Sequence, residues 1–278
     1  MIRRRLGFGL ATVLGIAPRG FFIPYRHAGK LPPPGARPPY VAVAAQLRRH
    51  ERDFRLVVSR LEDYADALRA IGRDAPPAPR WDQDWFPRLD AAVAYALVRR
   101  VAPRRIVEVG SGHSTRFLAR AVADGGHATR ITAIDPAPRA ALSALAVEII
   151  RAPLHQVGDT PFTELSAGDV LFIDSSHILM PGTDVDQLLN HVLPALPAGV
   201  RVHFHDVFLP DDYPSEWAWR GYNEQLGVAA LVHGGGYRPL FASHYVTTRL
   251  ADALNGGIIA ELPRVQGARE SSLWLEKL

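Results

Sequence analysis

Residues 105–120 of this 278-residue chain read RIVEVGSGHSTRFLAR, and they join an apolar strand to a helix through a glycine turn. The β-branched residues Ile106, Val107 and Val109 are typical of a strand buried on both faces. At residues 115–122 the apolar residues have helical spacing. Such a turn leaves free backbone N–H groups at the helix N-terminus and room for a ligand to approach the main chain. The stretch therefore predicts a strand–turn–helix unit, either with a ligand at the turn or tightly packed without one.

Glu108 is the unusual residue of this strand. A carboxylate near the end of a buried strand is costly unless another group pairs with it. A bound cation or the hydrogen-bond donors of a ligand are candidate partners for it.

Four later segments also read as short apolar strands, at residues 130–134, 147–150, 169–173 and 200–204. Polar residues follow most of them. Because ligands of open parallel sheets gather at the carboxyl ends of the strands, we expect four acids to share one edge: Glu108, Asp135, Asp174 and Asp206.

Two of the acids after these strands have specific interpretations. Asp135 stands where a doubly wound sheet places an acceptor for ribose hydroxyls, and the alternative is an Asp-Pro turn. Asp159 follows Gly158, and it either accepts from an adenine amino group or caps the next helix. The residues alone do not separate the two roles of Asp159.

Composition restricts the class of protein. The chain is 47% hydrophobic, which suits one α/β domain with an extension. It has no cysteine, which excludes disulfides, thiolate metal sites and a cysteine nucleophile. Residues 1–60 hold twelve Arg or Lys against two Asp or Glu, and because the whole chain is +4, the other 218 residues carry −6. The basic charge therefore belongs to an N-terminal arm, which either meets an acidic partner or is simply solvated.

The arm begins with three arginines and the apolar run LGFGLATVLGIA. This run is shorter than the roughly 20 residues that span a bilayer, and no small-x-small cleavage pattern follows it. We expect an amphipathic or docked helix, with peripheral membrane contact by residues 1–30. Residues 31–40, LPPPGARPPY, predict a stiff connector.

Residues 41–72 predict one long helix with a heptad-like apolar stripe. It lies either on the domain or against the same helix of a second subunit, which would make a homodimer. The stripe consists of Leu47, Phe54, Val57, Leu61, Tyr64, Leu68 and Ile71.

The segment 108–114, EVGSGHS, resembles the first motif of class I S-adenosylmethionine-dependent methyltransferases, with serine where the third glycine is commonest. Residues 172–177, FIDSSH, and 204–206, FHD, are similar to a subgroup that acts on small molecules. The resemblance runs from about residue 81 to the C-terminus. It implies S-adenosylmethionine as cofactor, held by Glu108, Gly110, Ser111, Gly112, Ser114, Asp135 and Asp159.

The resemblance also implies the fold: a Rossmann-like, doubly wound α/β sheet of seven strands, the last one antiparallel. Strands six and seven would be residues 237–247 and 271–278, with a helix at 222–233 before strand six. A nicotinamide-binding fold is the weaker alternative, because it expects glycine at Thr115 for close helix packing.

Two chemistries remain open for the second group of residues. In one, Asp174 and Asp206 bind a divalent metal, with or without a histidine, and mixed histidine and carboxylate ligands would suit Mn²⁺, Fe²⁺ or Zn²⁺ at least as well as Mg²⁺. In the other, His177 or His205 is the general base, and Asp206 or Asp174 fixes its tautomer. His203 is expected to be structural.

The sequence thus predicts a basic arm and helix at 1–80 and a methyltransferase domain at 81–278. The predicted activity is methyl transfer to a small-molecule acceptor, at a hydroxyl, by a cytoplasmic protein, either free or membrane-associated. No nucleic acid is expected as a partner. The alternative is a non-catalytic module that binds a partner or membrane through the arm and the heptad helix.

Overall fold

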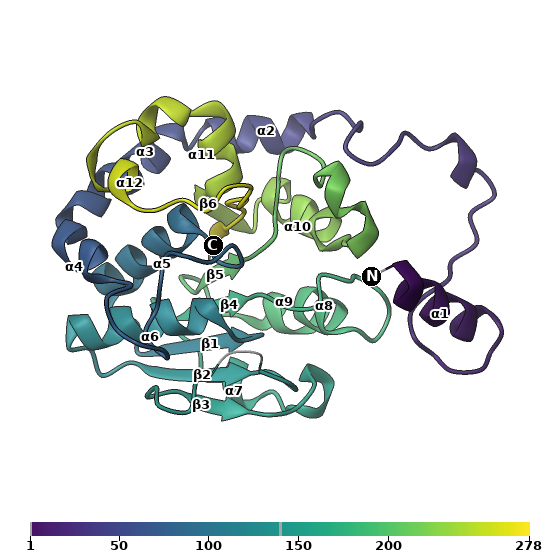
Figure 1. Ribbon diagram of the computed structural model, residues 1–278, viewed down its shortest axis with the longest axis horizontal. Coiled ribbons are helices and arrows are strands. Elements are labelled where there is room, and N and C mark those ends of the chain that lie inside the picture. The colour runs from purple at the N-terminus through teal and green to yellow at the C-terminus, as the bar shows by residue number, and fades with distance from the viewer. Residues whose placement is uncertain (1, 139–140) are drawn as a thin grey trace.

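The computed structural model describes residues 2–138 and 141–278, with the backbone alone for residues 2–5. One seven-stranded sheet organises the molecule, in the order β3-β2-β1-β4-β5-β7-β6 (Figure 1). Its strands are β1 (Arg105–Val109), β2 (Arg130–Ile134), β3 (Glu148–Ile150), β4 (Val170–Ile173), β5 (Arg201–Phe204), β6 (Tyr237–Ala242) and β7 (Leu273–Lys277).

The pairing of these strands confirms the predicted fold class. β1 lies between β2 and β4 in parallel register, with Glu108 opposite Ala133 and Phe172. β5 continues the parallel part, and β7 then runs antiparallel to both β5 and β6. The carboxyl ends of β1, β2, β4 and β5 therefore meet at one edge, which is where the four acids were predicted.

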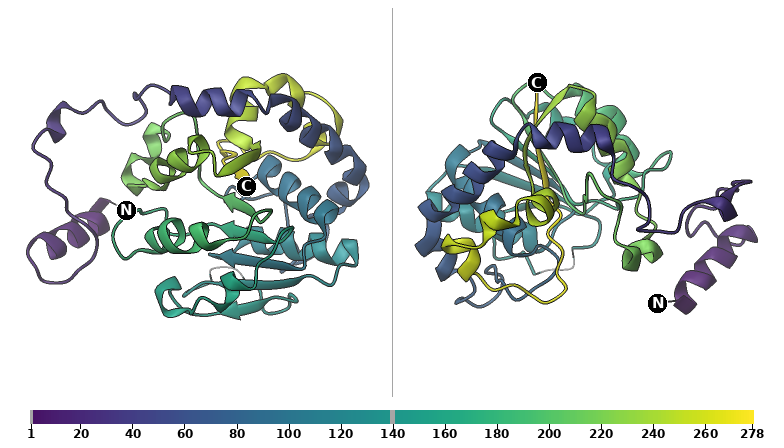
Figure 2. Two further views of the ribbon diagram at one scale, coloured as in Figure 1. Left: turned by 180° about the vertical axis from the view of Figure 1, so that it is seen from behind. Right: turned by 90° about the horizontal axis from the view of Figure 1, so that it is seen from above.

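Helices cover both faces of the sheet. α5 (Arg88–Val101) and α6 (His113–Gly125) pack together on one face. The helical segment from α8 (Asp184–Gln187) through the π-helical turn η4 (Leu188–Val192) to α9 (Leu193–Ala195) lies on the other face with α10 (Glu224–His233) (Figure 2). The remaining short helices are η3 (Leu154–Gln156), α7 (Thr160–Thr163), η5 (Ser215–Arg220), α11 (Ser243–Arg249), η6 (Ala251–Leu254) and α12 (Gly257–Glu261).

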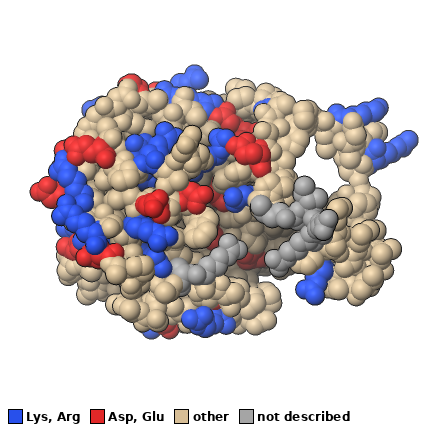
Figure 3. All heavy atoms as spheres, in the orientation of Figure 1, with Lys and Arg blue, Asp and Glu red and all other residues tan. Residues whose placement is uncertain are grey.

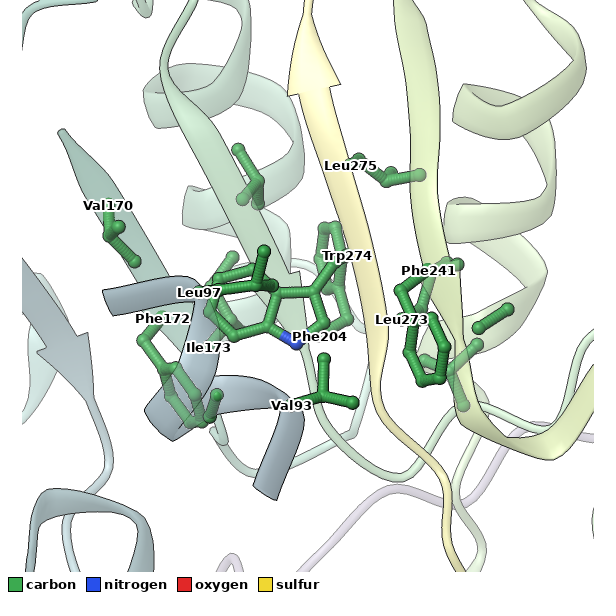
Figure 4. Packing of buried hydrophobic residues seen from close by; sticks show 14 of the residues in the cluster. Val93, Leu97, Val170, Phe172, Ile173, Phe204, Phe241, Leu273, Trp274 and Leu275 are labelled. Atoms are coloured by element: carbon green, nitrogen blue, oxygen red, sulfur yellow. The ribbon is translucent and has the colours of Figure 1, made fainter. Parts of the chain in front are cut away.

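Trp274 of β7 lies at the centre of the core and is fully buried (Figure 4). It packs against Phe172 of β4, with ring centroids 5.9 Å apart, and against His203 of β5 at 4.8 Å. Burial of a side chain of this size removes roughly 150–250 Å² from water. Because Phe172, His203 and Trp274 are register partners on neighbouring strands, β7 shares one face of the core with β4 and β5.

The prediction of one long helix at residues 41–72 is wrong. The segment divides into α2 (Val41–Arg48), α3 (Glu51–Ser59), η2 (Arg60–Tyr64) and α4 (Ala65–Ala70). These pieces wrap around the domain, with α2 against α10, α3 against β6 and η2 against α5, and a straight helix could not follow that curve. Five of the seven stripe residues are still buried, and one of them, Phe54, packs edge-on against Phe241 with ring centroids 5.9 Å apart.

The predicted sixth strand also ends early. β6 stops at Ala242, and residues 243–249 form α11. Val246 and Tyr245 on that helix are buried against the core, which explains why the segment reads as an apolar strand.

The N-terminal arm lies apart from this body. α1 (Ile2–Val13) and the turn η1 (Ala28–Lys30) stand beside the carboxyl-end edge, joined to α2 by an extended chain (Figures 1 and 2). Within the described residues, no helix combines the length and hydrophobicity needed to cross a membrane.

Candidate active site

A cavity of about 2650 Å³ opens at the carboxyl ends of the strands. One wall is the glycine turn after β1 with Asp135 after β2, and another is formed by the residues that follow β4 and β5. The predicted site residues that line it are Gly110, Ser111, Gly112, Ser114, Asp135, Asp174, His177, His205 and Asp206. Glu108 and Asp159 are not among its lining residues.

Gly110 can only be glycine in this arrangement. Its φ is 84°, in the left-handed region, and a Cβ added there would lie 1.9 Å from the carbonyl oxygen of Asp174. A Cβ on Gly112, by contrast, would meet open space. The turn after β1 is thus pressed against the backbone at the end of β4, which joins the two walls of the cavity.

Glu108 finds its partners within the turn. Its carboxylate is completely buried and accepts hydrogen bonds of 2.6 Å from the hydroxyls of both Ser114 and Thr115. Burial raises the pKa of Glu108 to about 8, although the two hydroxyls oppose the shift. The residue therefore fixes the first turn of α6.

Asp135 lies at the cavity with both carboxylate oxygens engaged. The Ser111 hydroxyl donates to one at 2.7 Å, and the Ala137 backbone N–H donates to the other at 2.7 Å. Asp159 is exposed at the start of α7, where its side chain makes no capping hydrogen bond. Of these two predicted ligands of the nucleoside, only Asp135 is brought to the cavity.

His177 lies at the centre of a group of acids, which we call the acid–histidine cluster: Asp174, His177, Asp206 and Glu224. Its Nδ1 is 2.8 Å from Glu224 Oε2, and its Nε2 is 3.3 Å from Asp174 Oδ1 and 3.6 Å from Asp206 Oδ2. Burial alone lowers the pKa of His177, but hydrogen bonds to Asp174 and Glu224 and the charge of Asp206 outweigh it and raise the pKa well above its usual value. The imidazole is therefore held as a cation at neutral pH.

Two residues of this cluster have strained backbones. His177 has φ of 60° and Asp206 has φ of 56°, which are uncommon values for residues other than glycine. Strain of this kind persists only where the surrounding structure enforces it, and it concentrates at functional sites. Here it turns both side chains toward one another at the ends of β4 and β5.

Glu224 is a site residue that the sequence alone did not predict. It is the first residue of α10 and is almost completely buried, and burial raises its pKa while the bond to His177 opposes the shift. It lies 47 positions from His177 in the chain, so no local spacing could have paired the two. The only signal was a carboxylate near the start of the helix predicted at residues 222–233.

His203 in β5 and His205, which directly follows this strand, differ in their surroundings. His205 lines the cavity, its Nε2 donates to the backbone carbonyl of Trp85 at 2.9 Å, and its buried Nδ1 has no hydrogen-bond partner. His203 lies in the core. Its ring stacks on that of Phe172 with centroids 3.6 Å apart, and its Nε2 forms a hydrogen bond of 2.8 Å with the Ser272 hydroxyl. Burial lowers the pKa of His203 well below its usual value, so it is neutral.

An aromatic segment after β5 closes one side of the cavity. The guanidinium of Arg220 lies 3.9 Å from the ring centroid of Trp217, and its Nη1 is 3.7 Å from Asp206 Oδ2. The ring centroids of Tyr222 and His177 are 4.5 Å apart. This aromatic segment is therefore adjacent to the acid–histidine cluster, and Arg220 is a further positive charge beside Asp206.

The described residues do not arrange a metal site. No group of three or more His, Asp or Glu side chains among them is placed to hold one ion. Instead the His177 imidazole lies between the carboxylates of Asp174 and Asp206, in the place that a metal ion bound by both carboxylates would take. The metal-binding role of these two acids stays a prediction from sequence.

Residues 107–207 match a family model described as a methyltransferase domain. This region contains the last three residues of β1, all of β2 to β5, the glycine turn and all but one of the residues of the acid–histidine cluster. This part of the chain therefore matches a methyltransferase domain, in agreement with the predicted resemblance to class I S-adenosylmethionine-dependent methyltransferases. The strand order, with β7 inserted antiparallel between β5 and β6, is the order that this class implies.

Several solved structures are distantly similar to this methyltransferase. The SAH-bound methyltransferase PaMTH1 of Podospora anserina is 15% identical, covering 93% of this chain and 99% of its own, with a TM-score of 0.44. The branched-chain polyamine synthase of Thermus thermophilus is 15% identical over 78% of this chain and 64% of its own, with a TM-score of 0.45. An O-methyltransferase of Bacillus cereus in complex with SAH is 18% identical over 53% and 64%, with a TM-score of 0.31. No curated protein sequence matches the chain.

Proposed function

We propose that this methyltransferase transfers the methyl group of S-adenosylmethionine to a hydroxyl of a small molecule. One observation carries the proposal: the glycine turn with Asp135 and the acid–histidine cluster line the same cavity. They are joined where Gly110 meets the backbone of Asp174. A cofactor held on the first wall would have its reactive end beside the second.

The first wall suits the nucleoside and amino-acid parts of the cofactor. The turn at 110–114 presents backbone N–H groups at the start of α6, and Asp135 accepts from ribose hydroxyls in place of the Ser111 hydroxyl. A charge-assisted hydrogen bond of this type contributes roughly 1.5–3 kcal/mol. Glu108 supports the turn from inside the core.

The second wall suits the acceptor. Bound S-adenosylmethionine supplies a methyl group on a sulfonium, so the O–CH₃ bond forms as the S–CH₃ bond breaks. Asp174 and Asp206 accept the hydrogen bond of the acceptor hydroxyl and then its proton, and His177 fixes both carboxylates from one side. Arg220 and the rings around it cover the acceptor from solvent.

Calorimetry with S-adenosylhomocysteine tests the cofactor half of the proposal. We expect binding at micromolar concentrations, and no heat at high micromolar ligand would refute it. A screen of metabolite extracts with labelled cofactor then tests the acceptor. Label in a base-stable ether of a small molecule supports hydroxyl transfer, and label only in amines would contradict it.

We also propose that the catalytic domain starts near residue 81. In this division residues 1–80 form an extension whose helices α2–α4 cover the side of the domain and whose arm lies beside the cavity.

A further inference from the structure

The arm exposes a large share of the apolar surface of the protein. Twelve of the seventeen exposed large hydrophobic side chains in the described part of the chain lie between residues 6 and 41. They are Leu6, Phe8, Leu10, Val13, Leu14, Ile16, Phe21, Phe22, Ile23, Tyr25, Leu31 and Val41. Exposed apolar surface concentrated in this way marks an interaction site.

α1 shows the pattern most clearly. Leu6, Leu10 and Val13 lie at helical spacing on one stripe, and each is 59–60% exposed. A surface helix normally turns such a stripe toward the core. At 12 residues, α1 is about 18 Å long, which is well short of the hydrocarbon core of a bilayer. It could lie in a membrane interface but could not cross it.

The charge of the arm has one sign. Residues 1–50 contain nine Arg or Lys and no Asp or Glu. On the face shown in Figure 3 the arm carries basic side chains and no acidic ones. Met1 and the side chains of residues 2–5 lie outside the described residues. Arg3, Arg4 and Arg5 therefore add to the positive charge of the sequence, but their side chains have no described position.

The arm is fixed to the body at its far end and faces the cavity along its length. Arg37 Nε donates to Asp212 Oδ2 at 2.8 Å, and the Tyr40 backbone N–H donates to the Pro210 carbonyl at 2.8 Å. Leu10 and Phe22 of the arm are among the residues that line the cavity. The resulting space of about 2650 Å³ is larger than the roughly 300–1,000 Å³ of an ordinary small-ligand pocket.

We propose that residues 6–41 dock on an anionic bilayer surface, with the apolar side chains in the interface and the Arg and Lys side chains on the headgroups, so that the mouth of the cavity faces the membrane. A bilayer is the partner whose chemistry matches both features, because it offers negative charge above an apolar layer along the whole arm. The docking itself does not depend on the proposed function. Its consequence does: the methyl acceptor is then reached from the membrane side.

Sedimentation with vesicles tests the docking. We expect the full chain to bind phosphatidylcholine vesicles containing about 30% phosphatidylglycerol at least tenfold more tightly than pure phosphatidylcholine, and to release them in about 1 M salt. Leu14→Asp with Ile16→Asp should weaken binding about tenfold or more, since each side chain is at least two-thirds exposed in the arm. Leu56→Asp on α3, which is 46% exposed, is the matched control and should bind normally. Equal binding by the arm variant and the control, or no binding by the full chain, would overturn the proposal.

A second measurement tests which way the cavity faces. Because the chain has no cysteine, a single environment-sensitive fluorophore can be placed at Met180→Cys on the cavity wall or at Leu56→Cys. Anionic vesicles should shift the emission of the first label to the blue and leave the second unchanged, and the reverse would overturn the proposed orientation.

Binding of S-adenosylhomocysteine by the same variants separates this proposal from the function. Loss of vesicle binding with normal S-adenosylhomocysteine binding is expected for the arm variant. A full chain that binds S-adenosylhomocysteine but no vesicles would refute the docking alone, and one that binds vesicles but no S-adenosylhomocysteine would refute the function alone. Light scattering that shows a dimer dissociated by the arm substitutions would mean that a second copy covers the arm, which also overturns the proposal.

Discussion

The two walls of the cavity are built in different ways. The wall after β1 and β2 uses backbone N–H groups, a glycine with positive φ and hydroxyls, and its residues lie within about one βαβ unit of the chain. The wall after β4 and β5 uses one imidazole among three carboxylates, and Glu224 joins it from α10.

The difference separates binding from chemistry. Donors of the main chain hold a ligand in place without changing charge, whereas a buried cluster of ionisable groups can accept or release a proton. We therefore expect substitutions on the first wall to change cofactor affinity or stability and those on the second to change the rate.

Asp206→Asn should produce the largest effect. It removes a charge beside His177 while keeping the shape, and Asn tolerates the positive φ at this position. Loss of a proton acceptor typically costs 10²–10⁴-fold, so we expect kcat to fall by about 10³-fold with S-adenosylhomocysteine affinity unchanged. Labelled methyl transfer and calorimetry measure the two quantities. A fall in affinity with an unchanged kcat would erase the distinction between the walls.

Glu108→Gln should change how stability depends on pH. The pKa of Glu108 is raised in the folded state to about 8, so its contribution to stability is full below the unfolded pKa of about 4.5 and is lost as pH rises toward 8. Between pH 5 and 7 this loss amounts to about 2–3 kcal/mol, since each pKa unit is worth about 1.4 kcal/mol. Denaturant unfolding of wild type and variant at both pH values measures it. Parallel pH dependences in the two proteins would remove Glu108 as the cause.

Asp135→Ala should weaken S-adenosylhomocysteine binding by one to two decades, or roughly 1.4–2.8 kcal/mol. The reason is the loss of the acceptor for the ribose hydroxyls. Ser111→Ala is the matched control, because it removes the neighbouring hydroxyl but leaves the carboxylate. Affinity that stays the same in Asp135→Ala would take this residue out of the cofactor site.

Glu224→Gln should have the smallest effect on rate, about tenfold. The amide still bonds to His177 Nδ1, but the charge that helps to raise the pKa of His177 is lost. The alkaline limb of the kcat profile should then move to lower pH, because the imidazole loses its proton earlier. A uniform loss of activity at every pH would indicate a purely structural role.

Local patterns accounted for most of the sheet. β2 runs over the predicted residues 130–134, and β1, β3, β4 and β5 fall within one residue of the predicted bounds, whereas β7 was expected from the family resemblance. Strand length, β-branching and the glycine turn are properties of adjacent residues, and so they can be read without the fold. The break of residues 41–72 into short helices depends on the curved surface that they cover. A straight helix and a bent one would show the same apolar stripe, so the sequence could not predict the break.

The candidate site divides in the same manner. Most of the site residues directly follow strands, and the carboxyl ends of parallel strands meet at one edge of a sheet, so their convergence could be predicted. These residues are the turn at 110–114, Asp135, Asp174, His177, His205 and Asp206. The inward orientation of Glu108 toward Ser114 and Thr115 depends on the first turn of α6, and the pairing of His177 with Glu224 depends on where α10 begins. Side-chain direction of this kind is decided in three dimensions and leaves no spacing to find.

The position of β7 has a consequence for biosynthesis. β7 follows the other six strands of the sheet in sequence but lies between β5 and β6, and among the described strands only β7 pairs with β6. While the chain emerges from the ribosome, β5 and β6 therefore keep open edges until residues 273–277 are available. Open strand edges are templates for aggregation, so nascent chains that stall before residue 273 should be the ones that chaperones capture.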